Sequence, residues 1–243
     1  MNEDGTEDGG PTLSPRARFC AVIPAFNESG RIGPVVAEAR RHGLAVIVVD
    51  DGSSDNTASV AAAAGAEVIR HAENAGKGAA LRTGFRRALE ASYEGVVTLD
   101  ADGQHDPEEI PKFIEAYERT GIPVLIGNRL WNPAGMPLVR RLTNRFMSWL
   151  LSREMGRYVP DTQCGFRFIR TDLLPYLETH SERFAAESEV LLEMAARGIR
   201  MDSVRIRTIY GGERSKIRPC ADTIRFWRML RRWRARHSAA RQA

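Results

Sequence analysis

The stretch TLDADGQHDPEEI, residues 98–110, follows a short apolar run and gathers several oxygen-bearing side chains within a few positions. The apolar run is typical of a buried strand, and the second half of the stretch is typical of a helix start. Alternate residues of an extended segment project to one side, so Asp100, Asp102 and Gln104 can offer three oxygens to one cation. Oxygen ligands favour Mg²⁺ or Mn²⁺, and Mg²⁺ usually also binds substrate phosphates. The stretch therefore predicts a metal site at these three residues.

The alternative for this loop is an acidic cap on the following helix. Asp106 suits the N-cap position and Pro107 the first helical position, and Glu108 and Glu109 favour the first turn. We therefore predict that Asp106 and the two glutamates are structural. His105 has no evident partner, and we expect it to be a solvated loop residue.

Strand-like and helix-like segments alternate along most of the chain, which predicts an α/β fold. Continuous apolar strands separated by helices are typical of a mostly parallel sheet with helices on both faces. Ligands bind beyond the carboxyl ends of the strands in such sheets, and each strand here ends in polar residues. We expect these ends to form one site. Besides the run before Asp100, the strand-like segments are 19–26, 44–50, 66–71 and 123–129.

Two of the polar strand ends have both a ligand-binding and a structural interpretation. In VVDDGSSDNT the adjacent acids Asp50 and Asp51 stand in a sequence suited to a turn and a helix cap. Helix capping does not explain Asp50, the first of the two acids. A carboxylate at this position can accept hydrogen bonds from a nucleobase N–H or a ribose hydroxyl. Lys77, between two glycines, can neutralise a phosphate, although the segment lacks the Walker A pattern. A solvated helix start is the equally open alternative for Lys77.

The composition limits the functional classes. Hydrophobic residues make up 43% and charged residues 27% of the 243 residues, as in ordinary globular proteins. Three scattered cysteines indicate a reducing compartment, and no apolar run is long enough for a signal peptide or a membrane span. The net charge is +4, but residues 222–243 alone carry seven arginines and one acid, so a general nucleic-acid footprint is not supported. We expect a disordered acidic tail at 1–17, a catalytic domain at 18–221 and a basic amphipathic helix at 222–243.

Two segments combine an apolar stripe at helical spacing with arginines on other positions, as interfacial helices do. In the segment 138–152, packing of the stripe in the core is the alternative. In the C-terminal segment, the alternative is packing against a partner protein. The first stripe is Val139, Leu142, Phe146, Trp149 and Leu150, with Arg140, Arg141 and Arg145 beside it. The second stripe is Phe226, Met229, Leu230 and Trp233.

Six segments in a fixed order resemble the inverting family 2 glycosyltransferases, in particular the polyprenyl- and dolichyl-phosphate sugar synthases. The segments are VIPAFNE, VVDDGSSDNT, NAGKGAALRTGF, TLDADGQHDP, IGNR and DTQCGFRFIR, within residues 18–220. The resemblance implies a GT-A fold and inverting transfer of a mannose, glucose or related hexose from a UDP- or GDP-sugar to a polyprenyl phosphate.

The resemblance also implies site residues. Asp102 and Arg129 would be catalytic, and Asp100, Asp102 and Gln104 would hold the metal. The acceptor phosphate would bind Arg129, Arg140, Arg141 and Arg145. The nucleotide sugar would bind Pro24, Ala25, Asn27, Glu28, Asp50, Asp51, Lys77, Asp100, Ala101 and Asp102.

A lipid phosphate acceptor implies a cytoplasmic protein attached peripherally to the inner face of the membrane, and an integral membrane subunit is compatible with this. A phosphate needs cations rather than a general base, and we expect Asp161 to orient the acceptor arginines. A mobile basic loop with Arg214, Lys216 and Arg218 would close over phosphates. One alternative is transfer to a sugar hydroxyl, with Glu187 or Glu189 as base. The other is a non-catalytic subunit, which would have little use for an intact metal triad.

Overall fold

The structure, a computed structural model, describes residues 18–177, 184–209 and 219–240. The predicted acidic tail at 1–17 and the predicted basic loop with Arg214, Lys216 and Arg218 lie outside the described residues.

The described residues form a seven-stranded sheet in the order β3-β2-β1-β4-β6-β5-β7. Neighbouring strands are parallel except for β6, which runs antiparallel to both β4 and β5. The predicted mostly parallel sheet is therefore confirmed. A strand is also expected within 161–170, where β6 lies, and β7 is a further strand that the sequence did not indicate. The strands are β1 (Phe19–Ala25), β2 (Ala45–Asp50), β3 (Glu67–Arg70), β4 (Gly95–Thr98), β5 (Val124–Asn128), β6 (Arg167–Arg170) and β7 (Met201–Arg205).

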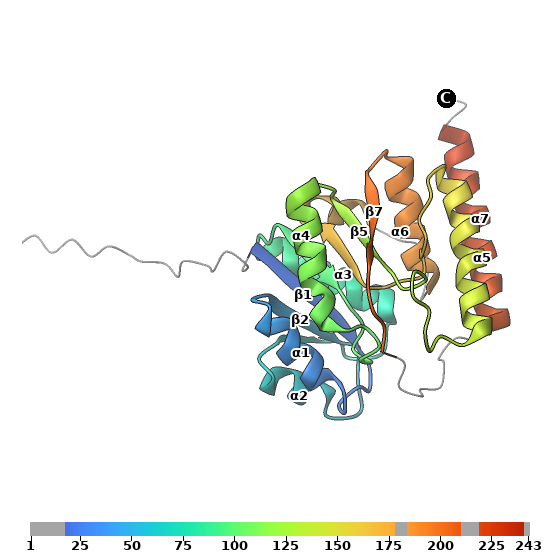
Figure 1. The fold of residues 1–243 in the computed structure, drawn as a ribbon. Helices are drawn as coiled ribbons and strands as arrows, with labels where there is room; N and C mark the ends of the chain where they lie inside the picture. The colour runs from blue at the N-terminus through green and yellow to red at the C-terminus, as the bar shows by residue number, and fades with distance from the viewer. Residues whose placement is uncertain (1–17, 178–183, 210–218, 241–243) are drawn as a thin grey trace, which may run out of the picture.

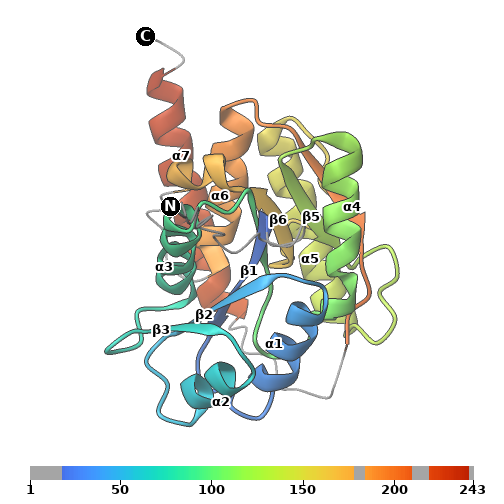
Figure 2. The ribbon, with the colours of Figure 1, turned by 90° about the vertical axis from the view of Figure 1, so that its left-hand side faces the viewer.

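Helices cover both faces of the sheet. Figures 1 and 2 show α1 and α4 on one face and α3 and α6 on the other, with α5 and α7 next to α6. The α-helices are α1 (Ile32–Arg41), α2 (Thr57–Ala63), α3 (Lys77–Glu90), α4 (Ile110–Thr120), α5 (Leu138–Met155), α6 (Phe184–Ala196) and α7 (Pro219–Ala240). Two short 3₁₀ helices are η2 (Pro107–Glu109) and η3 (Thr171–Tyr176).

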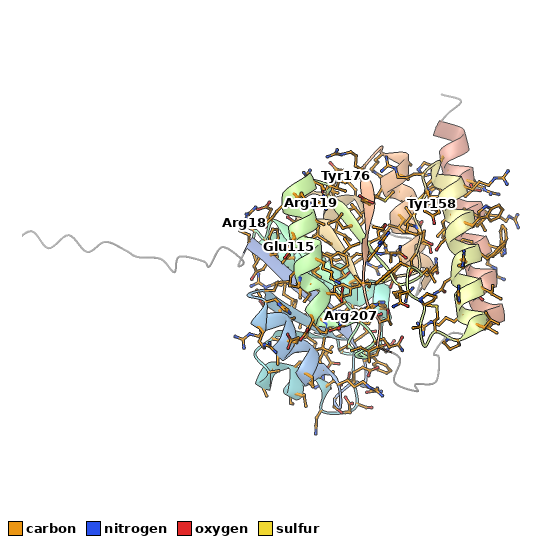
Figure 3. All side chains as sticks on the ribbon, in the orientation of Figure 1. Arg18, Glu115, Arg119, Tyr158, Tyr176 and Arg207 are labelled. Atoms are coloured by element: carbon orange, nitrogen blue, oxygen red, sulfur yellow. The ribbon has the colours of Figure 1, made fainter. Side chains whose placement is uncertain are left out.

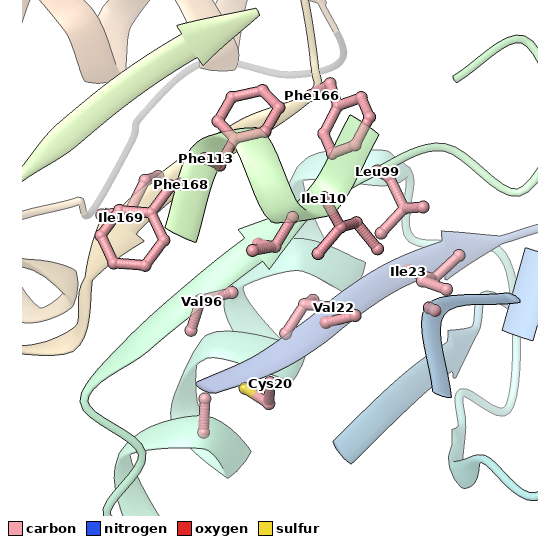
Figure 4. Close-up of a cluster of buried hydrophobic side chains, with 14 of the residues drawn as sticks. Cys20, Val22, Ile23, Val96, Leu99, Ile110, Phe113, Phe166, Phe168 and Ile169 are labelled. Atoms are coloured by element: carbon pink, nitrogen blue, oxygen red, sulfur yellow. The ribbon is translucent and has the colours of Figure 1, made fainter. Parts of the chain in front are cut away.

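The main core fills both faces of the central strands, against α3 on one side and against α1 and α4 on the other. Figure 4 shows part of this core, with residues of β1 and β4 close to aromatic side chains that come from α4 and β6. Phe113 of α4 stacks on Phe166, which directly precedes β6, with ring centroids 4.7 Å apart. All of these side chains are buried, as a strand covered on both faces requires. This packing fixes the end of β4, from which the loop with Asp100 begins.

The acidic residues after that loop are structural, as predicted. The Asp106 carboxylate caps η2 by accepting a hydrogen bond from the N–H of Glu108 at 3.1 Å, with Pro107 at the first helical position. Glu109 is fully buried and forms ion pairs with Lys112 and with Arg207, which is labelled in Figure 3. The loop is therefore anchored at its C-terminal end to α4 and to the residues after β7.

The apolar stripe of α7 is buried within the chain itself. Phe226, Met229, Leu230 and Trp233 form a second core cluster with Leu150 and Leu151 of α5 and Leu192 of α6. The prediction that this C-terminal stripe lies in a membrane interface is therefore wrong, because α5 and α6 already cover it.

The apolar stripe of α5, unlike that of α7, is mostly exposed to solvent. Val139, Leu142, Phe146 and Trp149 are all exposed, and only Leu150 enters the core. The alternative interpretation of this stripe as a core-packing face is thus wrong for four of its five residues. No helix among the described residues is long and apolar enough to cross a membrane.

Candidate active site

The order of the strands brings the polar strand ends to one edge of the sheet. β2, β1 and β4 are parallel neighbours, so the residues that follow them emerge side by side. β6 is antiparallel to β4, with Thr98 opposite Arg167, so the segment just before β6 reaches the same edge. The segment 161–166 therefore lies next to Asp100, although some sixty residues separate them in sequence.

An ionic cluster stands at the end of β4. The Lys77 ammonium at the start of α3 lies 2.5 Å from Asp100 Oδ1 and 2.6 Å from Glu187 Oε1 of α6. Burial opposes the charge on Asp100, but the Lys77 ammonium outweighs it and lowers the pKa of Asp100. Burial also opposes the charge on Lys77, yet Asp100 and Glu187 raise its pKa. Both groups are therefore charged at neutral pH, and they line a pocket between α3, β4 and α6.

Gly165 leaves the space that this cluster occupies. A Cβ atom at this position would lie 3.1 Å from Lys77 Nζ and 3.5 Å from both Asp100 Oδ2 and Glu187 Oε2. A Cβ atom here would therefore press on the Lys77 ammonium and make ordinary contacts with the two carboxylates.

The donor chemistry after β4 fits a hard divalent cation. Asp102 Oδ1 accepts a hydrogen bond from the N–H of Gln104 at 3.0 Å, and Gln104 Oε1 accepts from the Arg140 guanidinium at 3.2 and 3.3 Å. Among the described residues, no three His, Cys, Asp or Glu side chains form a complete metal site. Two carboxylates and one amide oxygen leave coordination positions for a substrate diphosphate and water, as Mg²⁺ sites commonly do. Metal binding at Asp100, Asp102 and Gln104 stays a prediction.

His105 holds the main chain of the metal-site loop. It is only 2% exposed, and its Nδ1 accepts a hydrogen bond from the N–H of Asp100 at 3.0 Å. Its ring lies 5.3 Å from that of Phe166, and its backbone bridges to Thr208. Burial lowers the pKa of His105 to about 4, so the ring is neutral at pH 7. The expectation of a solvated histidine is wrong, because the segments before β6 and after β7 cover it.

The predicted nucleotide-binding residues lie at the ends of β1 and β2 and already make internal contacts. The Asp51 carboxylate accepts from the N–H groups of Ala75 at 2.9 Å and Gly76 at 2.7 Å, and pairs with His71 at 2.8 Å. Asp50 accepts from the N–H of Ser53 at 3.0 Å and lies 3.2 Å from Arg70. Both carboxylates thus hold the loops of this edge together.

The end of β1 is fixed in the same manner. Asn27 Oδ1 accepts from the N–H of Ser54 at 2.9 Å, and the buried Glu28 pairs with Arg31 at 3.1 Å. Pro24 and Ala25 end the strand itself, and Ala101 follows Asp100 in the neighbouring loop. The strand order places these residues at the predicted edge, and their nucleotide contacts stay predictions.

Arg129 and Asp161 form a buried bidentate pair on the expected acceptor side. Arg129 Nε and Nη2 donate to the two carboxylate oxygens at 2.8 and 2.9 Å, and the Arg129 N–H donates to Oδ2 at 3.1 Å. Asp161 is 0% exposed and Arg129 is 6% exposed. The contact between Asp161 and an arginine is therefore present, as expected. Arg140 reaches Gln104, whereas the guanidinium groups of Arg141 and Arg145 have no hydrogen bond or ion pair recorded with the described residues.

Comparison with known proteins places the chain in a family. A family model described as Glycosyl transferase family 2 matches residues 20–177. The chain belongs to glycosyl transferase family 2. Similar relatives include the UDP-N-acetylglucosamine–dolichyl-phosphate N-acetylglucosaminyltransferase of Methanococcus voltae, 32% identical over 78% of this chain and 84% of the relative. Another is the undecaprenyl-phosphate mannosyltransferase of Micrococcus luteus, 34% identical over 65% of this chain and 68% of the relative.

Solved structures show the same fold. The glucosyl-3-phosphoglycerate synthase of Mycobacterium tuberculosis, in complex with phosphoglyceric acid, matches with a TM-score of 0.70 and 23% identity, covering 90% of this chain and 79% of that one. A structure of that enzyme with Mn²⁺, UDP and glucosyl-3-phosphoglycerate matches with a TM-score of 0.66. The predicted family, GT-A fold and enzyme class are confirmed: the chain is a nucleotide-sugar-dependent glycosyltransferase.

The two glutamates considered as a general base differ in their surroundings in this family 2 glycosyltransferase. Glu187 points into the ionic cluster, where Lys77 pairs with it and Arg167 Nη2 lies at 3.9 Å. Glu189 is 1% exposed and pairs with Arg236 of α7 at 2.6 Å. Glu189 is thus bound to the C-terminal helix, and only Glu187 faces the site.

Arg167 is a part of the glycosyltransferase site that sequence reasoning missed. Its buried guanidinium donates to the carbonyl oxygens of Thr162 at 3.1 Å, Cys164 at 2.8 Å and Glu187 at 3.0 Å. It therefore ties the segment before β6 to the start of α6. Carbonyl oxygens leave no trace in a sequence, so no signal pointed to this role.

Proposed function

We propose that this glycosyltransferase moves a hexose from a UDP- or GDP-sugar to a polyprenyl phosphate. The main observation is the pair of arginines beside the metal-site loop, with Arg129 held by Asp161 and Arg140 in contact with Gln104. A phosphate monoester is anionic near neutral pH, so it needs positioning and charge neutralisation rather than a base. Planar guanidinium groups suit phosphate oxygens. The names of the relatives that act on dolichyl and undecaprenyl phosphate support this acceptor.

The strand-end residues bind the donor in this proposal. Asp100, Asp102 and Gln104 hold Mg²⁺ or Mn²⁺, which when bound stabilises negative charge on the departing nucleoside diphosphate. Asp102 and Arg129 are the proposed catalytic residues. Arg141 and Arg145 join Arg129 and Arg140 in the proposed acceptor-phosphate set. The proposed donor site comprises Pro24, Ala25, Asn27, Glu28, Asp50, Asp51, Lys77, Asp100, Ala101 and Asp102.

The protein works at a membrane surface in this proposal, because a polyprenyl chain of the acceptor resides in the bilayer. We propose a peripheral position on the inner face of the cytoplasmic membrane. An integral membrane subunit stays a prediction.

One observation favours a second candidate, transfer to a sugar hydroxyl. Glu187 is a carboxylate inside the site and has the right chemistry for a general base. However, Lys77 lies 2.6 Å from its Oε1, so this base would have to exchange that contact for the acceptor hydroxyl.

The substitution Glu187→Gln distinguishes the two acceptors. Label is followed from mixed radiolabelled UDP- and GDP-sugars into a short polyprenyl phosphate and, separately, into free sugars and glycans. The lipid-phosphate proposal predicts label in the organic phase and substantial activity in the glutamine variant. Glu115→Gln, on the exposed surface of α4, is the matched control (Figure 3). Label confined to sugars, together with an inactive Glu187→Gln variant, would establish the hydroxyl acceptor instead.

A further inference from the structure

The outer face of α5 carries a continuous apolar surface, which we define as Leu138, Val139, Leu142, Phe146 and Trp149. The exposed fractions of these residues are 67%, 74%, 58%, 53% and 55%. Their spacing places them on one side of the helix, and the rings of Phe146 and Trp149 lie 6.0 Å apart. Single exposed apolar residues need no explanation, but a contiguous group on one helix face marks an interaction surface.

The fold itself does not need this face. The opposite side of α5 supplies its contacts with the rest of the chain, through the buried residues Asn144, Ser148 and Leu151. The neighbouring helix α7 turns its own apolar stripe inward onto α5 and α6. The two helices thus have similar patterns, and only the stripe of α5 is left uncovered among the described residues.

Positive charge surrounds the outer face of α5. Arg145 and Arg153 are exposed beside it, and the Arg153 guanidinium lies 6.0 Å from the centre of the Trp149 ring. The sole acid of α5 is Glu154, which pairs with Arg234 of α7. Aromatic residues next to arginines are typical of surfaces that bind anionic membranes.

The adjacent surface of α7 has the same character. Figures 1 and 2 show α7 running beside α6, and α7 meets α5 through the second core cluster and the Glu154–Arg234 pair. Trp227, Arg228, Arg231 and Arg232 are exposed, and the part of α7 from 226 to 237 contains no acid. Exposed arginines are therefore present on both helices.

We propose that the outer face of α5 docks on an anionic lipid bilayer. Phe146, Trp149 and their apolar neighbours enter the interface, and the arginines of α5 and α7 contact lipid phosphates. A second copy of the chain is a poorer occupant, because a twofold contact would place the arginine-flanked faces against each other.

The same helix borders the active site. Arg140, in the first turn of α5, donates to Gln104 of the metal-site loop. Docking through α5 would therefore bring the acceptor side of the site to the bilayer surface. The value of docking for catalysis rests on the proposed lipid acceptor, whereas the docking of α5 on a bilayer does not depend on that acceptor.

The test is co-sedimentation of the full chain with vesicles, without donor, acceptor or metal. Wild-type protein is compared on phosphatidylcholine vesicles and on vesicles that also contain phosphatidylglycerol. We expect preferential binding to the anionic vesicles, weakened by salt, and a loss of at least about tenfold in the double variant Phe146→Ser/Trp149→Ser. Both residues are exposed, so its thermal unfolding should match wild type. Leu89→Ser/Tyr176→Ser, which changes exposed apolar residues of α3 and η3, is the matched control and should bind as wild type does.

Undiminished sedimentation of the Phe146→Ser/Trp149→Ser variant would overturn the proposal, as would equal binding of wild type to neutral and anionic vesicles. Light scattering that shows a wild-type dimer, converted to monomer by the same double substitution, would assign the face to a second copy. Vesicle binding and sugar transfer are measured separately. If the protein binds anionic vesicles as expected but transfers no sugar to a lipid phosphate, the proposed acceptor is wrong and the docking proposal stands.

Discussion

Removal of the Arg129 guanidinium should destabilise the protein strongly, beyond any effect on acceptor binding. Asp161 is fully buried and receives two side-chain bonds and one main-chain bond from Arg129. In Arg129→Ala only the main-chain bond from this residue persists, so a carboxylate is left buried without its cation. Breaking a buried pair in this way costs about 3–5 kcal/mol.

This cost is large compared with the usual stability of a domain, about 5–15 kcal/mol. For a chain of this size, each kcal/mol lowers Tm by about 2–4 °C, so Arg129→Ala should unfold about 6–20 °C below wild type. Thermal and urea unfolding followed by circular dichroism would measure the change.

A double-mutant cycle isolates the cause. Asp161→Asn should destabilise wild type, because it leaves Arg129 without its counter-charge, but should stabilise the Arg129→Ala variant, because it removes the buried charge. If Asp161→Asn changes stability in the same direction in both backgrounds, or if Arg129→Ala lowers Tm by less than about 2 °C, the buried pair does not stabilise the fold. Because alanine perturbs the fold, Arg129→Lys is the better probe of the acceptor, and it should retain more transfer activity than alanine but less than arginine.

Three further predictions concern the metal, the buried histidine and the C-terminal helix. Asp102→Ala should abolish turnover with the fold intact, and full activity in excess EDTA would contradict the metal prediction. Burial lowers the pKa of His105 to about 4 from 6.5. Between these two pH values the unfolded state binds a proton that the folded state does not, so the stability of the fold decreases as the pH is lowered. From pH 7 to pH 5 the metal-free protein should lose about 2 kcal/mol through this group, and urea unfolding of His105→Asn should lack that part of the slope. Trp233→Ala should cost about 3–5 kcal/mol, whereas Trp227→Ala, exposed on the same helix, should cost less than about 0.5 kcal/mol; equal costs would contradict the packing of α7.

The parallel part of the sheet could be predicted from the sequence because its signals are local. Continuous apolar runs, each ending in polar residues, identify the strands and the edge where Asp50 and Asp100 emerge. The cap formed by Asp106 is equally local, since its acceptor atom and the N–H that it binds are two residues apart.

The remaining site contacts depend on chain segments far apart in sequence. The pairing of Lys77 with Glu187 requires the antiparallel strand β6 between β4 and β5, and the amino-acid pattern of that segment does not specify its direction. His105 binds a main-chain N–H, which no sequence pattern displays. The stripes of α5 and α7 have nearly the same pattern, and only the packing of α7 on α5 and α6 determines which stripe is buried.

Product analysis of the wild-type protein identifies the acceptor. The full chain is incubated with a polyprenyl phosphate, Mn²⁺ and UDP- and GDP-sugars, and the organic phase is examined by mass spectrometry. We expect a polyprenyl phosphate that carries one hexose, formed with a single nucleotide-sugar class and absent when the acceptor is dephosphorylated. If the polyprenyl phosphate stays unmodified with every donor, and sugar is transferred to a water-soluble hydroxyl acceptor, the acceptor is not a lipid phosphate.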